Sequence, residues 1–385
     1  MKNPNVDRRQ FVAGAALASL GLAANVARAD RSASKPSSEP DPARAGAPGS
    51  GAKMLVLGGT RFLGPAVVEA ALARGMEVTL FNRGRSDPDR FTQLETLLGD
   101  RDPNKGEGLK ALEGDRTWDY VVDTSSYFPR ITRASVGLLK DRVKHYTMVS
   151  TVSVYGDMES GDIDESTPVA RIDDPTTESM GDQFQNYGPL KALCEEAAEE
   201  LMPGRVFNVR PGLIVGPDDA SHRFTYWPVR VREGGEVLVG GNLDDSVQYI
   251  DVRDLGEYIV HAAVEGLVGV YNAVGPSYGQ TIAGLVYGCR AVVESDARFT
   301  WVPTDGVSEL GLAPWGDLPV WSAGSAMDRV HGEKAWKSGL HTRDLADTVR
   351  ATLESWDAMP DAMKQRPAGM TREREKEALA AWHAR

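Results

Sequence analysis

The residues best suited to chemistry are a tyrosine and a lysine four positions apart, Tyr187 and Lys191, in the run Asn-Tyr-Gly-Pro-Leu-Lys. Positions i and i+4 of a helix share one face, so both side chains can point into the same cleft. A free phenol loses its proton at a pKa of about 10 and is a poor base at neutral pH. A nearby ammonium stabilises the phenolate and lowers that pKa, so the pair predicts a general acid/base.

A hydroxyl-rich segment upstream favours this interpretation over its alternative, a surface helix that begins with an aromatic residue. Residues 149–156 read Val-Ser-Thr-Val-Ser-Val-Tyr-Gly and include the end of an expected strand. A hydroxyl at this place can hydrogen-bond a substrate oxygen and orient it towards Tyr187. Thr151 is the candidate for this third catalytic role, with Ser150 and Ser153 as neighbours that could share it.

A glycine turn near residue 60 could hold the cofactor that such chemistry needs. Residues 53–64 read Lys-Met-Leu-Val-Leu-Gly-Gly-Thr-Arg-Phe-Leu-Gly, an apolar strand that leads into a turn before a helix. Glycines allow close backbone approach to a pyrophosphate, and a helix N-terminus favours its charge. A glycine turn alone is weak evidence, but its setting predicts dinucleotide binding. The expected cofactor-binding residues here are Gly58, Thr60, Arg61, Phe62, Leu63 and Gly64.

The end of the second strand bears on the choice between NAD and NADP. A carboxylate there would accept hydrogen bonds from the adenine ribose and favour NAD, whereas this chain has Asn82 and Arg83. A guanidinium suits a 2′-phosphate, and Arg61 could approach the same place, so NADP is preferred over NAD. The alternative is that both arginines face solvent. Asp100 could contact the adenine amino group or cap a turn.

The elements that must position these residues alternate between strand and helix. Strand patterns at 54–57, 77–81, 119–123, 146–150 and 205–210 alternate with helical patterns at 65–73, 133–140 and 187–201. This order predicts an α/β fold, a doubly wound parallel Rossmann sheet with helices on both faces. We expect the NAD(P)-binding domain to span 53–210. Residues 211–385 are expected to form mainly a smaller substrate-binding lobe that ends in a charged helix over 371–382.

The N-terminus has the layout of an export signal. Arg8 and Arg9 precede an uncharged stretch and the small residues Ala27 and Ala29, which resembles a cleavable twin-arginine signal peptide over 1–29. Residues 30–52, rich in Ser, Pro, Ala and Gly, are expected to be a disordered linker. The predicted location is periplasmic or secreted, with no stable membrane insertion after cleavage. The alternatives are an uncleaved anchor and a cytoplasmic enzyme whose N-terminus only mimics a signal.

Charge and cysteine content exclude several other functions. The 385-residue chain has a formal net charge of −12, and such a surface repels phosphate backbones, so no nucleic-acid partner is expected. Cys194 and Cys289 show no metal-ligand spacing, and neither do the histidines, so no metal site is expected. A disulfide between the two cysteines is possible in an oxidising compartment, although the sequence does not favour it.

Four motifs in this order resemble those of the extended short-chain dehydrogenase/reductases, the NAD(P)-dependent epimerase/dehydratase group, over nearly all of residues 53–340. They are the glycine turn, Leu-Gly-Asp at 98–100, Ser-Thr-Val-Ser-Val-Tyr-Gly at 150–156 and the Tyr187/Lys191 pair. The resemblance implies that Tyr187 is the general acid/base, that Lys191 tunes its pKa and holds the nicotinamide ribose, and that Thr151 is the third catalytic residue.

The chain also departs from that pattern. Arg61 stands where the family's turn usually has its middle glycine, a form similar to an atypical branch that includes chloroplast stem-loop RNA-binding proteins. Val247 replaces an arginine that holds the diphosphate in many nucleotide-sugar members, and a valine cannot pair with phosphate. This weakens a nucleotide-sugar substrate without excluding it, because Arg223, Arg230 and Arg232 lie in the expected substrate lobe.

These patterns predict an NAD(P)-dependent oxidoreductase or epimerase that acts on a carbinol or carbonyl of a sugar-like or other small molecule. An exported enzyme has little free cofactor around it, so tight cofactor retention is expected. The alternative is a ligand- or RNA-binding protein that uses the same fold without turnover. A homodimer paired through the helix that carries Tyr187 is common in the resembling superfamily and is expected here.

Overall fold

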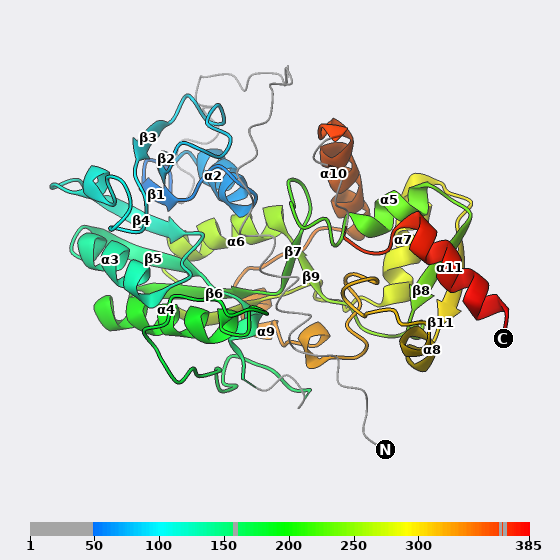
Figure 1. Ribbon diagram of the computed structural model, residues 1–385. Coiled ribbons are helices and arrows are strands. Elements are labelled where there is room, and N and C mark those ends of the chain that lie inside the picture. Colours follow the sequence, from blue (N-terminus) through cyan, green and yellow to red (C-terminus); the bar gives the residue numbers. More distant parts are fainter. Residues whose placement is uncertain (1–48, 157–160, 362–363, 365–367) are drawn as a thin grey trace.

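The computed structural model describes residues 49–156, 161–361, 364 and 368–385, which form two lobes (Figure 1). The predicted signal peptide at 1–29 and residues 30–48 of the predicted linker lie outside the described residues. The last four linker residues are held against the larger lobe, because Gly51 N donates to Gly75 O at 2.9 Å and Glu77 N donates to Ala52 O at 2.9 Å. No helix in the described part of the chain combines the length and apolar character needed to cross a membrane.

A seven-stranded parallel sheet forms the centre of the larger lobe, in the order β10-β6-β5-β4-β1-β2-β3. The interior strand β1 (Lys53–Leu57) lies between β4 and β2 and is completely buried from Met54 onwards, as expected of an apolar strand covered on both faces. The other strands are β2 (Glu77–Asn82), β3 (Glu95–Leu98), β4 (Trp118–Asp123), β5 (Val143–Val149), β6 (Val206–Pro211) and β10 (Gly269–Ala273). The predicted doubly wound α/β sheet is confirmed.

Helices cover both faces of this sheet (Figure 1). On one face α2 (Leu63–Ala73) packs against α6 (Val252–Glu265), and on the other α3 (Pro129–Leu139) packs against α4 (Tyr187–Leu201). Short 3₁₀ turns, η2 (Lys110–Leu112) and η3 (Val152–Val154), complete the lobe. The helix starts follow local chemistry, since Pro129 opens α3 and the Asp251 side chain caps α6 by accepting from Arg253 N.

The smaller lobe has its own apolar core, in which Trp227 and Trp321 are completely buried. Its elements are β7 (Leu213–Val215), α5 (Tyr226–Arg232), β8 (Glu236–Gly240), β9 (Tyr249–Asp251), α7 (Ile282–Val293), β11 (Arg298–Val302), α8 (Thr304–Glu309), α10 (Leu345–Ala358) and α11 (Arg372–His383). The 3₁₀ turn η4 (Ala326–Asp328) instead packs with η3 and α4 in a separate apolar cluster. The charged C-terminal helix α11 begins after the predicted cap Thr371, whose hydroxyl accepts from Arg374 N at 3.1 Å.

The chain crosses between the lobes more than once, so a single boundary near residue 210 does not describe the arrangement. After β9 it returns to the larger lobe, where α6 packs on α2 and β10 pairs with β6. Later, α9 (Glu333–Lys337) contacts β10. The sequence pattern beyond residue 210 did not reveal this return, because β10 is short and three of its five residues are only partly buried.

Candidate active site

The predicted cofactor cradle lies where β1 ends and α2 begins. β1 has β2 on one side and β4 on the other, so the turn over residues 58–62 lies where the strand order reverses. In doubly wound sheets, ligands bind outside the carboxyl ends of the strands at such a switch point. The topology therefore brings the predicted glycine turn to the place where this fold can hold a dinucleotide.

Two glycines of the turn allow backbone approaches that a side chain would block. Gly58 has φ +101°, and a Cβ there would lie 2.5 Å from Thr124 Oγ1. A Cβ on Gly64 would lie 2.2 Å from the carbonyl oxygen of Gly58, so α2 could not pack so closely against the turn. Phe62 also adopts a positive φ of 47° and precedes α2, which begins at Leu63 and not at Pro65 as predicted. These residues fit a turn that a pyrophosphate could approach closely.

The other predicted cofactor residues surround this turn. Thr60 and Leu63 are buried, whereas Arg61 and Arg83 are exposed and form no ion pair with any described residue. Asn82 is partly buried at the end of β2, and its side-chain oxygen accepts from Gly84 N at 2.8 Å. Two exposed guanidinium groups, one in the turn after β1 and one directly after β2, are compatible with a 2′-phosphate.

Asp100 follows β3 and forms the turn cap that was its alternative role. Its Oδ1 accepts from Asp102 N at 3.0 Å, while its own N–H donates to Gly108 O at 3.0 Å. An Asp side chain that accepts from a backbone N–H two residues on forms an Asx turn. This hydrogen bond stabilises the loop after β3.

The start of α4 packs tightly against the hydroxyl-rich segment. The helix spans Tyr187–Leu201, as predicted, and a Cβ on Gly188 would lie 2.0 Å from Ser153 O. Glycine at this position therefore lets the two segments touch. Thr151 caps η3 by accepting from Ser153 N at 3.1 Å. Hydrogen bonding by its hydroxyl also acts to lower the pKa of the Tyr187 phenol. The structure thus brings Thr151 and Tyr187 together, as the sequence predicted.

The pKa of Tyr187 is shifted in the direction opposite to the prediction. Burial raises this pKa strongly and nearby Tyr127 adds to the effect, whereas Thr151 and the positive charge of Arg223 lower it in part. Burial therefore outweighs the groups that lower this pKa, and the role of Lys191 in lowering it stays a prediction. A phenol with a raised pKa is protonated at neutral pH and can donate a proton.

Lys191 is buried, and its ammonium group contacts the ends of two strands. Its Nζ donates to Val149 O at 2.6 Å and to Ser126 O at 2.6 Å, and it lies 5.5 Å from the centroid of the Tyr127 ring. Burial lowers the pKa of Lys191. An ammonium has three N–H donors, so one donor remains for a ligand such as a ribose hydroxyl.

A buried polar cluster behind Lys191 was missed from the sequence. Arg101 forms an ion pair with Asp123 and donates from Nη2 to Ser126 Oγ at 2.8 Å. Ser126 Oγ and Tyr146 Oη donate to the same Asp123 carboxylate at 2.6 and 2.8 Å. Burial acts to raise the pKa of Asp123, but the Arg101 charge and these hydrogen bonds outweigh it and lower the pKa. Asp123-Thr-Ser-Ser126 directly after an apolar strand was the available signal.

The remaining sequence candidates take structural positions. Cys194 and Cys289 are free, buried and in different clusters, so they form no disulfide with each other. No group of three or more potential metal ligands occurs among the residues that the structure describes. Val247 is buried in the smaller lobe's core, so this position offers no charge to a diphosphate.

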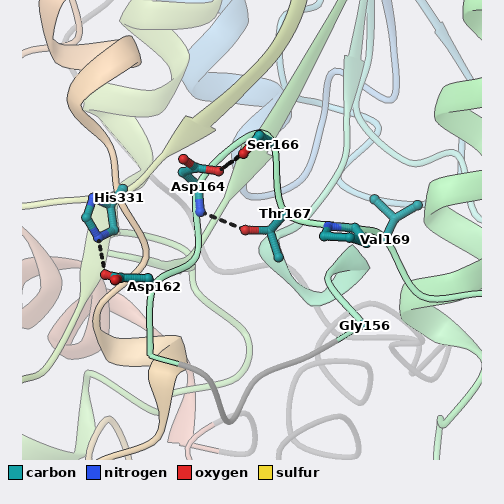
Figure 2. Close-up of a pocket in the computed structure, with 8 residues that line it drawn as sticks. Gly156, Asp162, Asp164, Ser166, Thr167, Val169 and His331 are labelled. Atoms are coloured by element: carbon teal, nitrogen blue, oxygen red, sulfur yellow. Dashed lines mark hydrogen bonds and ion pairs between the residues drawn. The ribbon is translucent and has the colours of Figure 1, made fainter.

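A pocket of about 790 Å³ lies beside the segment that follows η3, and none of the predicted site residues lines it. Figure 2 shows that its carboxylates have local partners. His331 Nε2 lies 3.2 Å from Asp162 Oδ1, while the Asp164 carboxylate accepts from Ser166 Oγ at 2.6 Å. These hydrogen bonds stabilise the loop that lines the pocket.

Two known proteins illustrate what the chain is similar to in sequence. Human epimerase family protein SDR39U1 is 27% identical over 261 residues, covering 63% of this chain and 82% of that protein. Its crystal structure with NADPH superposes with a TM-score of 0.52 and 22% identity, covering 78% of this chain and 99% of that chain. A 2-alkyl-3-oxoalkanoate reductase from Shewanella oneidensis is 29% identical over 252 residues, covering 58% of this chain and 60% of that protein.

A second solved structure extends the similarity in fold. UDP-glucuronic acid 4-epimerase from Bacillus cereus, in complex with NAD, superposes with a TM-score of 0.55 and 16% identity, covering 79% of this chain and 98% of that chain. The model of the NAD dependent epimerase/dehydratase family matches residues 54–273, from β1 through β10, and includes the glycine turn, Thr151, Tyr187 and Lys191. This chain therefore belongs to the NAD-dependent epimerase/dehydratase family.

Proposed function

We propose that this protein is an NAD(P)-dependent enzyme that acts on a carbinol or carbonyl carbon of a small molecule, with Tyr187 as general acid/base. The observation that carries the proposal is the contact of the hydroxyl segment with the start of α4, where a Cβ on Gly188 would lie 2.0 Å from Ser153 O. This contact places Thr151 beside Tyr187 at the carboxyl end of the sheet. Family membership and the glycine turn support the same conclusion.

Three residues of this chain have separate roles in the proposed reaction. When bound, a nicotinamide cofactor supplies the acceptor or donor of hydride. Tyr187 Oη gives a proton to the carbonyl oxygen in reduction and takes the hydroxyl proton in oxidation. The raised pKa of Tyr187 favours the protonated form that begins reduction. The Thr151 hydroxyl orients the substrate oxygen, and the remaining donor of Lys191 holds a ribose hydroxyl.

NADP is the preferred cofactor in this proposal, with NAD as the alternative. Arg61, in the turn after β1, and Arg83, directly after β2, are exposed and have no carboxylate partner among the described residues, so both are available to a 2′-phosphate. The human relative was solved with NADPH, whereas the Bacillus cereus epimerase was solved with NAD. The arginines therefore support NADP.

The net reaction depends on whether the cofactor stays bound. A retained cofactor that is regenerated in each turnover gives epimerisation or dehydration, and an exchanging cofactor gives reduction or oxidation. Both a reductase and an epimerase occur among the similar proteins. We propose tight retention, which is tested by denaturing the purified protein and identifying any released dinucleotide.

Replacing Tyr187 with Phe separates an enzyme from a binding protein. We expect Tyr187→Phe to lose at least about 100-fold in turnover, because the general acid/base is removed, and to keep cofactor affinity. Tyr278→Phe is the control, since this tyrosine is 63% exposed in the smaller lobe. Unchanged turnover in Tyr187→Phe would contradict the proposal. A wild-type protein that shows no turnover, together with a Tyr187→Phe variant that keeps the wild-type ligand affinity, would support the alternative of a binding protein.

Export through a twin-arginine signal is a separate proposal. It is supported by Arg8 and Arg9 before an uncharged stretch. We expect the mature N-terminus, determined by mass spectrometry, to lie close to residue 30. An Arg8→Lys/Arg9→Lys variant should stay in the cytoplasm at full length. A wild-type protein that keeps residue 1 and remains cytoplasmic would contradict export.

We also propose a homodimer that pairs through the face containing α4. Two residues on this helix, Glu196 and Glu200, are exposed and form surface ion pairs with Arg171 and Arg133. Light scattering coupled to size-exclusion chromatography measures the mass directly. A monomeric mass at micromolar concentration would contradict this proposal.

A further inference from the structure

The three arginines that the sequence placed in the substrate lobe have different environments. Arg230 is buried and donates to Glu375 Oε2 at 2.7 Å, which fastens α11 to the lobe. Arg232 forms a two-contact ion pair with Asp357 at 2.8 and 2.9 Å. Arg223 has no carboxylate within ion-pair distance anywhere in the described part of the chain. Of these three guanidinium groups, only that of Arg223 remains available to an anion.

A hydrogen-bonded chain orients Arg223 through one edge of its guanidinium group. Its Nε donates to Ser221 Oγ at 3.0 Å, and the Ser221 hydroxyl donates to the buried carboxylate of Asp219 at 2.8 Å. The two Nη groups donate to no described acceptor, and neither is completely buried. The pair of donors that binds a carboxylate in two parallel hydrogen bonds is therefore held in place and open.

The ring of Trp315 lies beside the same side chain. The Arg223 Cζ lies 5.5 Å from the centroid of the buried Trp315 ring. Trp315 belongs to a loop in which Trp315 and the β-branched Val320 adopt φ values of +66° and +73°, in the left-handed region that side chains disfavour. Backbone strain of this kind persists where the surroundings enforce it and is concentrated at ligand sites.

Arg223 and Tyr187 also interact electrostatically. Burial lowers the pKa of Arg223, and the charges of Asp219 and then of Tyr187 act to raise it. The positive charge of Arg223 acts in turn to lower the pKa of Tyr187. The two side chains come from different lobes, one from α4 and the other from the loop between β7 and α5. A substrate between them would contact both.

We propose that Arg223 binds a carboxylate of the substrate while Tyr187 acts on a nearby hydroxyl or carbonyl group. The substrate class is then a hydroxy acid, an oxo acid or a uronic acid. The inference rests on the proposed function and adds the charge and position of the group that is recognised. A partly buried guanidinium that forms no ion pair with a described residue carries a desolvation cost that an anionic ligand offsets.

A carboxylate suits this site better than a phosphate. The open side of Arg223 offers one positive charge and one planar pair of donors, which match the single charge and the two oxygens of a carboxylate, whereas a phosphate monoester carries about −1.5 to −2 charges and a third oxygen. Arg230 and Arg232 are already paired, and Val247 is apolar, so none of these three positions offers a further charge to a phosphate.

The test uses the cofactor-loaded protein and matched pairs of probes. Each pair joins an acid to a neutral analogue: glucuronate with glucose, galacturonate with galactose, and 3-hydroxyhexanoate with its methyl ester. Glucose 6-phosphate tests whether the site prefers a phosphate to a carboxylate. Binding is measured by calorimetry and turnover by the absorbance of reduced nicotinamide. Wild type is compared with Arg223→Gln, Arg223→Lys and the control Arg232→Gln.

We expect at least one acid to bind better than its neutral partner and better than the sugar phosphate. Arg223→Gln should weaken binding of that acid roughly 10- to 100-fold and leave the neutral partner unchanged, because charge-assisted hydrogen bonds are lost. Arg223→Lys should recover part of the affinity, and Arg232→Gln should behave as wild type. Arg223 has no ion pair with any described residue, so the thermal midpoint of Arg223→Gln should stay close to that of wild type.

Three results would overturn the proposal: neutral probes that bind as tightly as the acids, a phosphate that binds more tightly than any acid, or an Arg223→Gln variant that weakens acid and neutral probes equally. The two proposals can fail separately. A protein that binds neither NAD nor NADP contradicts the proposed function, whereas a protein that binds cofactor and favours neutral probes contradicts only the role of Arg223.

Discussion

Arg210 and Glu195 form a buried ion pair that connects β6 to the helix carrying Tyr187 and Lys191. Arg210 donates from Nε to Glu195 Oε1 at 2.9 Å and from Nη2 to Oε2 at 2.5 Å, and both side chains are about 5% exposed. The Arg210 guanidinium also lies 4.9 Å from the ring centroid of Tyr155. This contact sets the position of α4 on the sheet and therefore the position of Tyr187 and Lys191.

Removing one partner of this ion pair should be strongly destabilising. We expect Glu195→Ala to lower the free energy of unfolding by about 3–5 kcal/mol, because Arg210 would remain buried and unpaired. Urea denaturation measures the change. Glu196→Ala is the matched control on the same helix, since its ion pair with Arg171 is exposed and contributes about 0–1 kcal/mol. Equal losses in the two variants would contradict this account of α4.

Two glycines in helices should respond in opposite ways to alanine. In Gly64→Ala the added Cβ would lie 2.2 Å from Gly58 O, which is too close for two atoms that are not bonded. We therefore expect a loss of about 1–3 kcal/mol in the free energy of unfolding, together with weaker dinucleotide binding. In α3, a Cβ added to Gly137 would meet no atom within 4 Å, so Gly137→Ala should add about 0.5–1 kcal/mol. Thermal unfolding with and without NADP distinguishes them. A Gly64→Ala protein that keeps both properties would refute the close-approach argument.

Cofactor preference should depend on Arg83. Replacing Arg83 with Gln removes a guanidinium that can bind the 2′-phosphate, so the Kd for NADP should rise roughly 10- to 100-fold while that for NAD stays unchanged. Arg298→Gln, an exposed arginine at the start of β11 in the other lobe, is the control. Fluorescence titration of the reduced cofactors gives both constants. An equal change in the Kd values for NAD and NADP would show that Arg83 does not bind the 2′-phosphate.

The buried carboxyl group of Asp328 should make stability depend on pH. Burial raises the pKa of Asp328 to about 7, which the hydrogen bond from Ser322 only partly offsets. The folded protein therefore holds a proton that the unfolded chain releases near its ordinary pKa of about 3.8. This contribution is fully present below about pH 4 and is lost as pH rises towards 7.

The matched variant is Asp328→Asn, which keeps a hydrogen-bond acceptor for Ser322 and cannot ionise. Between about pH 4 and pH 7 wild type should lose up to about 1.4 kcal/mol per pH unit relative to this variant. Urea midpoints at several pH values measure the difference. Parallel pH profiles would mean that Asp328 stays ionised in the folded protein.

Much of the candidate site could be predicted from local sequence. An apolar run followed by glycines and a helix predicted the turn at 58–64, and the i, i+4 spacing placed Tyr187 and Lys191 on one helix. These features depend on neighbours a few residues away, because backbone φ/ψ preferences and side-chain periodicity are local properties. The same rules predicted the alternating strands and helices of the sheet through β6.

Only the tertiary structure decided how charges and burial combine. The sequence places three arginines in the smaller lobe, but Glu375 and Asp357, more than a hundred residues away, determine that Arg223 alone of the three lacks an ion pair with a described residue. The contacts of Lys191 with Ser126 O and Val149 O, and the raised pKa of Tyr187, likewise depend on packing between distant elements. Desolvation and ion pairing depend on distances in space, so local sequence determines the residue types at the candidate site and the fold determines their electrostatics.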